Sequence, residues 1–165
     1  MMARRIAILA GLVIVLIAVN WQIARKERVL REGTSILLAL APVDPRSLMQ
    51  GDYMRLDYAI AREIGWRNEW PNDGQIVIRT DGDGVAAFVR RHEGAPLAPG
   101  EHLLLYRRRG GRIRIGTDAY FFEEGTAWRY DDARYGELRV DADGESLLVG
   151  LRDAQRRALD STQAP

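Results

Sequence analysis

The sequence predicts an all-β domain, either a small sandwich or a partly open barrel of hairpins, preceded by one N-terminal transmembrane helix. The first observation is an uncharged apolar run of membrane-spanning length near the N-terminus. The second is a change of pattern after Gly33, where short apolar runs alternate with turn signals rich in glycine and aspartate. The 165 residues suffice for one domain and one membrane segment.

The apolar run covers residues 6–23 and contains no charged side chain. As a helix it would extend about 27 Å, close to the roughly 30 Å hydrocarbon core of a bilayer. Trp21 lies where interfacial aromatic side chains belong. The sequence that follows lacks the small residues of a cleavage site, so we favour an uncleaved anchor over a cleaved signal peptide. The lipid bilayer is therefore a predicted partner of residues 6–23.

Charge distinguishes this segment from the rest of the chain. Residues 1–32 carry six basic and two acidic side chains, whereas the other 133 residues carry 18 basic and 21 acidic ones. An acidic domain behind an anchor argues against nucleic-acid binding. The excess of basic residues after the apolar run favours a cytoplasmic domain, but a short N-terminal tail before such a run is typical of export signals. We expect the β-domain on the extracytoplasmic side of a bacterial cytoplasmic membrane.

The chain divides into three predicted regions. Residues 1–32 form the anchor and a juxtamembrane helix, which Gly33 should end. Residues 33–153 form the β-domain. Residues 154–165 form a polar C-terminal tail, whose first part could be helical and whose last residues look disordered.

Short strands joined by tight turns should make up the β-domain. Strands are predicted at residues 35–41, 53–60, 75–80, 85–91, 102–108, 112–116, 119–122, 137–141 and 146–151. Glycine-containing hairpin turns are predicted at residues 81–84, 109–111 and 142–144. Helical turns are predicted at residues 44–49, with Asp44 as N-cap and Pro45 at the first position, and at residues 126–134.

The stretch QGDYMRLDYAI, residues 50–60, should begin with a Gly51-Asp52 turn and continue as a strand. Side chains of a strand alternate between two faces. The set that should face the core is apolar: Met54, Leu56, Tyr58 and Ile60. We expect the hydroxyl of the buried tyrosine to find a hydrogen-bond partner. The set that should face solvent or a groove, and is a candidate binding surface, is Tyr53, Arg55 and Asp57.

The same stretch resembles the signature of the GDYXXLXY family. All five signature positions are filled, by Gly51, Asp52, Tyr53, Leu56 and Tyr58. The later sequence YFFEEGTAWRYDDARYGELRVDADGESLLVGLRD also resembles the end of that family, so the resemblance covers about residues 35–153. It implies a membrane-anchored bacterial protein of unknown function, often found beside multi-pass membrane proteins. It assigns no catalytic residue.

The chain is poor in catalytic constellations. It has no cysteine, which excludes disulfides and thiolate chemistry. Its only lysine, Lys26, flanks the anchor, so a Ser–Lys peptidase would lack its base. His92 and His102 could act as bases near neutral pH, but no serine lies in a nucleophile-elbow pattern. Acidic turns at residues 81–84 and 141–145 resemble calcium loops only in part. We predict no catalytic residue, no metal and no cofactor.

Two further groups of side chains are candidate binding surfaces. Trp66 and Trp70 lie in a predicted loop and could either dock a partner or pack in the core. Five arginines lie within eight residues and could contact anionic lipid or an acidic partner; they are Arg107, Arg108, Arg109, Arg112 and Arg114.

These observations predict a non-enzymatic, single-pass membrane protein. Its β-domain would be an accessory or binding module for a membrane partner, expected to be a multi-pass membrane protein. Two alternatives stay open. One is a weak hydrolase or small-ligand-binding enzyme with a groove near Tyr53, and the other is a module that binds anionic lipid through residues 107–114.

Overall fold

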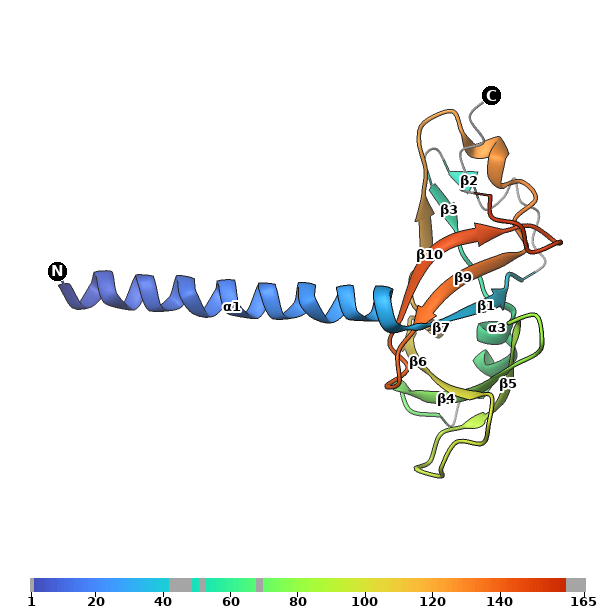
Figure 1. Cartoon of the computed structure of the whole chain (residues 1–165), viewed down its shortest axis with the longest axis horizontal. Helices are drawn as coiled ribbons and strands as arrows, with labels where there is room; N and C mark the ends of the chain where they lie inside the picture. Colours follow the sequence, from blue (N-terminus) through green and yellow to red (C-terminus); the bar gives the residue numbers. More distant parts are fainter. Residues whose placement is uncertain (1, 42–48, 51–52, 68–69, 160–165) are drawn as a thin grey trace.

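The computed structural model shows a long N-terminal helix that projects from a β-domain (Figure 1). It describes residues 2–41, 49–50, 53–67 and 70–159. The predicted helical turn at residues 44–49 falls mostly outside these residues, as do Gly51, Asp52 and the end of the polar tail. The predicted fold class, an all-β domain behind one apolar helix, is confirmed.

Helix α1 (Met2–Glu32) is one continuous helix about 46 Å long. Its segment from Ile8 to Glu32 contains an 18-residue window with a mean hydropathy of 1.9 and is long and apolar enough to cross a membrane. The described side chains from Ile8 to Arg28 are all exposed, and only Val29 is buried against the β-domain. The helix ends as predicted, with the Gly33 amide donating to the Val29 carbonyl over 3.0 Å.

The described strands form three antiparallel sheets. The first has the order β1-β9-β10: β1 (Thr34–Ala39), β9 (Tyr135–Val140) and β10 (Ser146–Arg152). The second has the order β2-β3-β8: β2 (Met49–Gln50), β3 (Tyr53–Arg55) and β8 (Ala119–Phe121). The third has the order β5-β4-β6-β7: β5 (Ala86–Arg91), β4 (Asp73–Thr80), β6 (Glu101–Arg109) and β7 (Arg112–Arg114).

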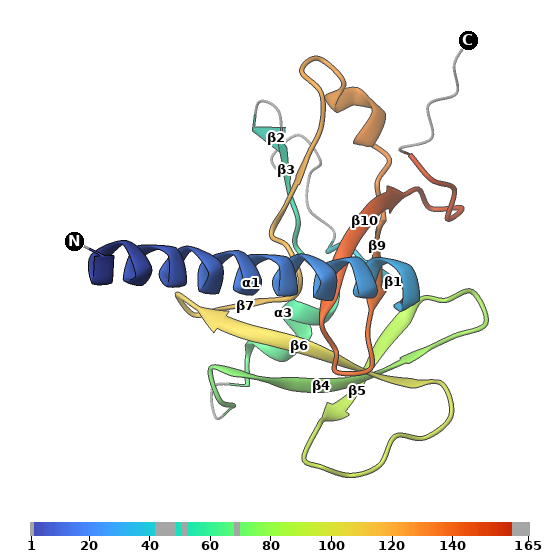
Figure 2. The ribbon, with the colours of Figure 1, turned by 60° about the vertical axis from the view of Figure 1, so that its left-hand side comes forward.

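The first and third sheets curl around a common core to give a partly open barrel. The Leu37 amide donates to the Gly84 carbonyl, and the Leu105 amide donates to the Gly144 carbonyl, each over 2.9 Å. These bonds connect the two sheets at two separate places. Gly144 allows the second contact, because a Cβ there would lie 2.9 Å from the Leu104 backbone nitrogen. Figures 1 and 2 place β2 and β3 at one end of the domain and β4 and β5 at the other.

The core contains aliphatic side chains from both curled sheets, because alternate residues of each strand face inward. Several are fully buried, and burial of each large aliphatic side chain contributes about 1.5–3 kcal/mol. The central ones are Ile36, Leu38, Ile76, Ile78, Leu104 and Leu138.

The predicted hairpins are confirmed, and their turns explain the acidic motifs. Asp81 accepts the amides of Asp83 and Val85 through Oδ1, each over 2.9 Å. Asp141 accepts the amides of Asp143 and Glu145 in the same way, over 3.0 and 2.8 Å. The two turns therefore use aspartate to satisfy backbone donors, as Asx turns do.

The predicted strand over residues 53–60 is wrong in its second half. Strand β3 ends at Arg55, and helix α3 (Ala59–Gly65) begins directly after Tyr58. Ile60, Ala61 and Ile64 form a buried stripe at helical spacing, which outweighs the strand pattern. The predicted inner face is nonetheless correct, because Met54, Leu56, Tyr58 and Ile60 are all buried.

The predicted helical turn after residue 126 is confirmed as a 3₁₀ helix, η1 (Ala127–Tyr130). The helix considered after Asp153 is not formed. The buried Asp153 carboxylate instead accepts the amides of Gln155 and Arg157, over 2.9 and 2.8 Å. Burial raises the pKa of Asp153, but the Arg157 amide and guanidinium outweigh that effect and the net pKa is lowered. This side chain folds the segment into a turn.

Candidate functional site: a cationic groove beside Tyr53

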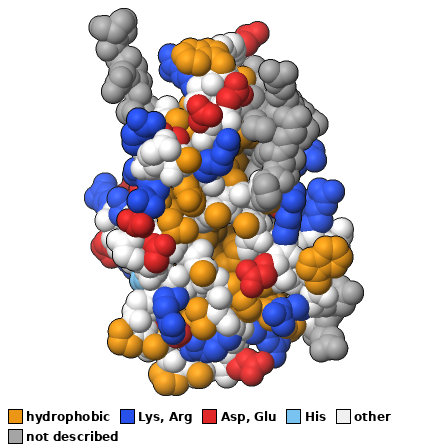
Figure 3. Space-filling model, turned by 90° about the vertical axis from the view of Figure 1, so that its right-hand side faces the viewer, with side chains coloured by type: hydrophobic (Ala, Val, Ile, Leu, Met, Phe, Trp, Pro, Cys, Tyr) orange, Lys and Arg blue, Asp and Glu red, His pale blue; other side chains and the backbone are white. Residues whose placement is uncertain are grey.

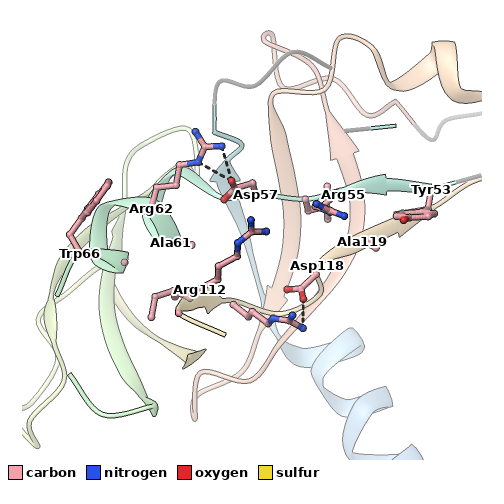
Figure 4. A pocket seen from close by; sticks show the side chains of 14 residues that line it. Tyr53, Arg55, Asp57, Ala61, Arg62, Trp66, Arg112, Asp118 and Ala119 are labelled. Atoms are coloured by element: carbon pink, nitrogen blue, oxygen red, sulfur yellow. Dashed lines mark hydrogen bonds and ion pairs between the residues drawn. The ribbon is translucent and has the colours of Figure 1, made fainter. Parts of the chain in front are cut away.

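A groove of about 1240 Å³ lies on the Tyr53 face of β3, and we call it the Tyr53 groove. It is bordered by β3 and the start of β8, by α3, and by β7 with the turn before it. Figure 4 shows Trp66 at one end and Tyr53 at the other, with Arg112 between α3 and β3. The groove is thus formed by four elements from two separate stretches of the chain.

Four arginines and two aspartates line the Tyr53 groove, which gives it a net charge of +2. Asp57 Oδ2 accepts Arg62 Nε over 2.8 Å and lies 2.7 Å from a terminal nitrogen of the same guanidinium. Asp118 pairs with Arg114 over 2.6 Å. Arg55 and Arg112 form no ion pair or hydrogen bond with other described side chains. Their charges are therefore available to a ligand.

The floor and rim of the groove are apolar. Leu56, Ala61 and Ile113 line it between the charged side chains. The indole of Trp66 is 86% exposed. A Cβ on Gly65 would meet no atom within 4 Å, so the space above the end of α3 is open. An apolar surface with unpaired cations suits an anionic ligand that also carries apolar groups.

The structure brings together the three side chains that were predicted to face solvent or a groove. Tyr53, Arg55 and Asp57 all line the groove, and the Tyr53 ring packs against Phe121 with the centroids 5.7 Å apart. Of the other signature residues, Leu56 and Tyr58 are buried in the core, whereas Gly51 and Asp52 lie outside the described residues.

The two tryptophans are separated by the fold. Trp66 lines the Tyr53 groove. Trp70 is half-buried and packs between Phe88 and Tyr106, with ring centroids 6.0 and 5.7 Å away. Only the first remains a candidate contact residue.

The arginine-rich hairpin of β6 and β7 presents four exposed arginines. Cross-strand pairing sets Arg107 opposite Arg114 and Arg109 opposite Arg112, so these four share one face. Arg109 is paired with Asp73 over 3.2 Å. Arg108 differs, because it donates to the Arg67 carbonyl over 2.8 Å and thereby fixes the hairpin to the chain after α3.

Neither histidine lines the Tyr53 groove, although both are in the described part of the chain. His102 lies near the start of β6, and His92 follows β5 with its amide bonded to the Gln75 carbonyl over 3.0 Å. Among the described residues there is no group of three or more side chains placed to hold a metal ion.

Sequence reasoning missed Arg62 and Asp118 as groove residues. Asp57 and Arg62 are five residues apart, which is informative only once α3 is known to begin at Ala59. Arg114 and Asp118 are four apart but not helical, so no periodicity connects them. The two ion pairs belong to one site because the tertiary fold places β3 beside β7.

A second unpredicted feature attaches α1 to the β-domain. Glu145, in the turn between β9 and β10, pairs with Arg25 over 2.9 Å and also accepts a hydrogen bond from Lys26. The Lys26 hydrogen bond lowers the pKa of Glu145, burial opposes this, and the charges of Arg25 and Arg107 lower it further. The end of the apolar helix is thus fastened to the domain.

The surface that points away from α1 mixes apolar and charged side chains of both signs (Figure 3). No curated protein and no solved structure matched the chain. The sequence model of one family, described as GDYXXLXY protein, matches residues 15–151. This range begins inside α1, earlier than the residues that carried the resemblance. The chain therefore belongs to the GDYXXLXY protein family.

Proposed function

We propose that this protein is a single-pass membrane-anchored module that docks another membrane protein through the Tyr53 groove, on the extracytoplasmic side of a bacterial cytoplasmic membrane. The observation that supports this most is the pair of guanidinium groups, on Arg55 and Arg112, that line an apolar groove without a partner among the described residues. Burying unpaired charge is costly, so such groups are expected to face either solvent or a complementary ligand.

The attachment of α1 restricts where a partner can lie. The uncharged run ends at residue 23, and Arg25 follows after about 3 Å of helical rise. Because Arg25 and Lys26 bind Glu145, the turn between β9 and β10 would lie close to the bilayer surface. A multi-pass membrane protein with short loops presents its surface at that depth, which supports it as the partner class.

The groove favours binding over catalysis. Both of its aspartates are engaged by arginines, and no histidine lines it within the described chain. General acid–base chemistry near neutral pH needs a positioned group that can exchange a proton. Arginine stays protonated and does not serve as one. These features support a docking site over the hydrolase alternative.

Co-purification from native membranes tests this proposal. We expect the wild-type chain to retain a specific membrane protein, and the double variant Arg55→Glu/Arg112→Glu to lose it. Arg129→Glu is the matched control, because Arg129 is exposed on η1 beside Trp128 and does not line the groove. A β-domain that consistently purifies alone would contradict the proposal.

A second candidate is binding of anionic lipid by the β6–β7 hairpin. Arg107 lies close enough to Glu145 to lower its pKa, and Glu145 is bound to the end of α1, so one part of the hairpin is near the expected bilayer surface. Flotation of the soluble β-domain, without the apolar helix, with anionic vesicles distinguishes this candidate. Reversing the charge of Arg107, Arg108 and Arg109 should abolish flotation if lipid is the ligand, and leave it unchanged if it is not.

A further inference from the structure

The outer edge of β7 is a free strand edge beside the Tyr53 groove. Among the described strands, β7 is the last of its sheet and pairs only with β6. The turn before it has two residues, Gly110 and Gly111, with φ of 56° and 76°, which fits a type I′ hairpin. In such a hairpin the flanking pair, here Arg109 and Arg112, exchanges both backbone hydrogen bonds.

It follows that Ile113 turns its backbone amide and carbonyl away from β6. Pairs alternate along an antiparallel ladder, so the next pair, Arg108 with Ile113, is not hydrogen-bonded. The Arg108 amide confirms this geometry, because it donates outward to the Asn72 carbonyl. No backbone group of another described residue forms a hydrogen bond with Ile113 across the free edge. Ile113 therefore offers one donor and one acceptor to an added strand.

The side chains around this edge define the chemistry of such a strand. Arg112 and Arg114 lie on one face of β7, and Ile113 lies on the other. A strand paired with β7 would place two of its side chains, two residues apart, opposite the arginines. The side chain between them would lie on the Ile113 face. The complementary pattern is acidic, apolar, acidic.

Pairing with a second copy of this chain is disfavoured by the same residues. Two β7 edges would bring arginines directly opposite arginines, and like charges across a ladder are destabilising. Charged side chains on an edge strand are a common protection against self-association. They do not oppose a strand of opposite charge. The edge borders open space, because Arg112, Ile113 and Arg114 all line the Tyr53 groove.

We propose that the free edge of β7 binds an extended acidic segment of the partner, with the pattern acidic–apolar–acidic, as an added strand of the β5-β4-β6-β7 sheet. This rests on the proposed docking function and names the partner segment. Main-chain hydrogen bonds at Ile113 contribute affinity that does not depend on sequence, and the arginines select for acidic side chains. Arg112 reaches into the groove from β7, where it can contact the segment (Figure 4).

A generic peptide suffices as the probe, because backbone pairing and charge are both tolerant of sequence. The full chain in detergent micelles is titrated with a blocked pentapeptide Thr-Glu-Val-Glu-Thr. One control is Thr-Lys-Val-Lys-Thr. The other, Thr-Glu-Glu-Val-Thr, has the same composition and charge but places its two acids on opposite faces of a strand. We expect the first peptide to bind best and to slow hydrogen exchange of the Ile113 amide.

Two variants of the chain test whether the arginines of β7 contribute to peptide binding. Arg112→Glu should weaken binding of the first peptide by about tenfold or more, since it removes a charge-assisted contact and adds repulsion. Arg129→Glu should leave binding unchanged. Equal binding of the two acidic peptides, an unchanged exchange rate at Ile113, or no binding of the first peptide would overturn strand addition.

These outcomes are separable from the docking proposal. If co-purification succeeds and depends on Arg55 and Arg112, but the peptide does not bind, the groove docks its partner by other chemistry and strand addition is wrong. If the peptide binds as expected but no membrane protein co-purifies, strand addition stands and the docking proposal is wrong.

Discussion

Tyr58 buries its ring in the core but leaves its hydroxyl without a hydrogen-bond partner in the described part of the chain. The expectation that this hydroxyl finds a partner is therefore wrong. Burial raises the pKa of Tyr58, and the nearby charge of Asp118 raises it further. The aromatic ring packs against Gly136, where a Cβ would lie 3.0 Å from Cε1 of the ring. The contribution of this signature residue is thus packing.

The variant Tyr58→Phe tests this at the residue scale. Removing an unpaired buried hydroxyl should leave the free energy of unfolding unchanged or raise it by up to about 1 kcal/mol. Tyr58→Ala should lower it by about 3–5 kcal/mol, because the ring would leave a cavity. Chemical denaturation of the full chain in detergent measures both. A loss above 1 kcal/mol for the phenylalanine variant would show that the hydroxyl is hydrogen-bonded.

At the scale of elements, Glu101 connects three strands of one sheet. It lies at the start of β6 and accepts Arg79 from β4 over 2.9 Å and Arg90 from β5 over 2.8 Å. Its side chain is 3% exposed, and it also accepts the Ala98 amide over 3.0 Å. The Ala98 amide and the Arg90 hydrogen bond lower the pKa of Glu101 from 4.5 to about 2, against the effect of burial.

A pH-dependent stability follows from this lowered pKa. The unfolded chain takes up the proton near pH 4.5, whereas the folded chain does so only near pH 2. The stabilisation from Glu101 is therefore complete above about pH 4.5 and is lost as the pH falls toward 2. Glu101→Gln should be less stable than wild type at neutral pH, and the difference should narrow over that window.

Thermal melts between pH 2 and 7 measure this prediction. Glu93→Gln is the control, because Glu93 pairs with Arg91 at an exposed position and its loss should change little at any pH. A gap between wild type and Glu101→Gln that stays constant as the pH falls would contradict the role given to Glu101.

The elements differ in how far the sequence predicts them. The hairpins were predictable because Asp81 and Asp141 each precede a glycine-containing turn between apolar runs. Helix α3 was not, because residues 54–60 fit a strand pattern and the helical stripe of Ile60, Ala61 and Ile64 is short. The candidate site was predicted in part. The alternation of side chains along a strand predicts the face that carries Tyr53. That Arg112 lines the same groove depends on tertiary contacts, which no local sequence pattern reveals.

At the scale of the whole molecule, Glu145 determines how α1 meets the β-domain. Its partner Lys26 is 119 residues away in the sequence, so the pairing could not be predicted from any local pattern. Arg139 adds a hydrogen bond to the Gly33 carbonyl over 3.1 Å. Together with buried Val29, these contacts fix the end of α1 against the β-domain. In the proposed membrane-anchored arrangement, an anchor attached in this way would hold the groove at a defined height above the membrane.

Glu145→Gln should loosen this junction without unfolding the domain. Loss of the two ion pairs is worth up to about 1 kcal/mol, so the Gly33 amide should exchange up to about fivefold faster. Glu27→Gln is the matched control, because Glu27 pairs only with Arg31 within α1 among the described residues. Hydrogen exchange by mass spectrometry measures both variants. Equal exchange at residues 28–33 in the two would contradict the proposed role of Glu145.

Photocrosslinking in native membranes tests the central claim, that the Tyr53 groove docks a membrane protein, most directly. A photoreactive phenylalanine analogue replaces Trp66 in the groove or, as a control, Val149 on β10, which is 40% exposed and does not line the groove. We predict one specific crosslinked membrane protein from position 66, lost when Arg112→Glu is added, and none from position 149. No crosslink from position 66, or the same products from both positions, would contradict the claim.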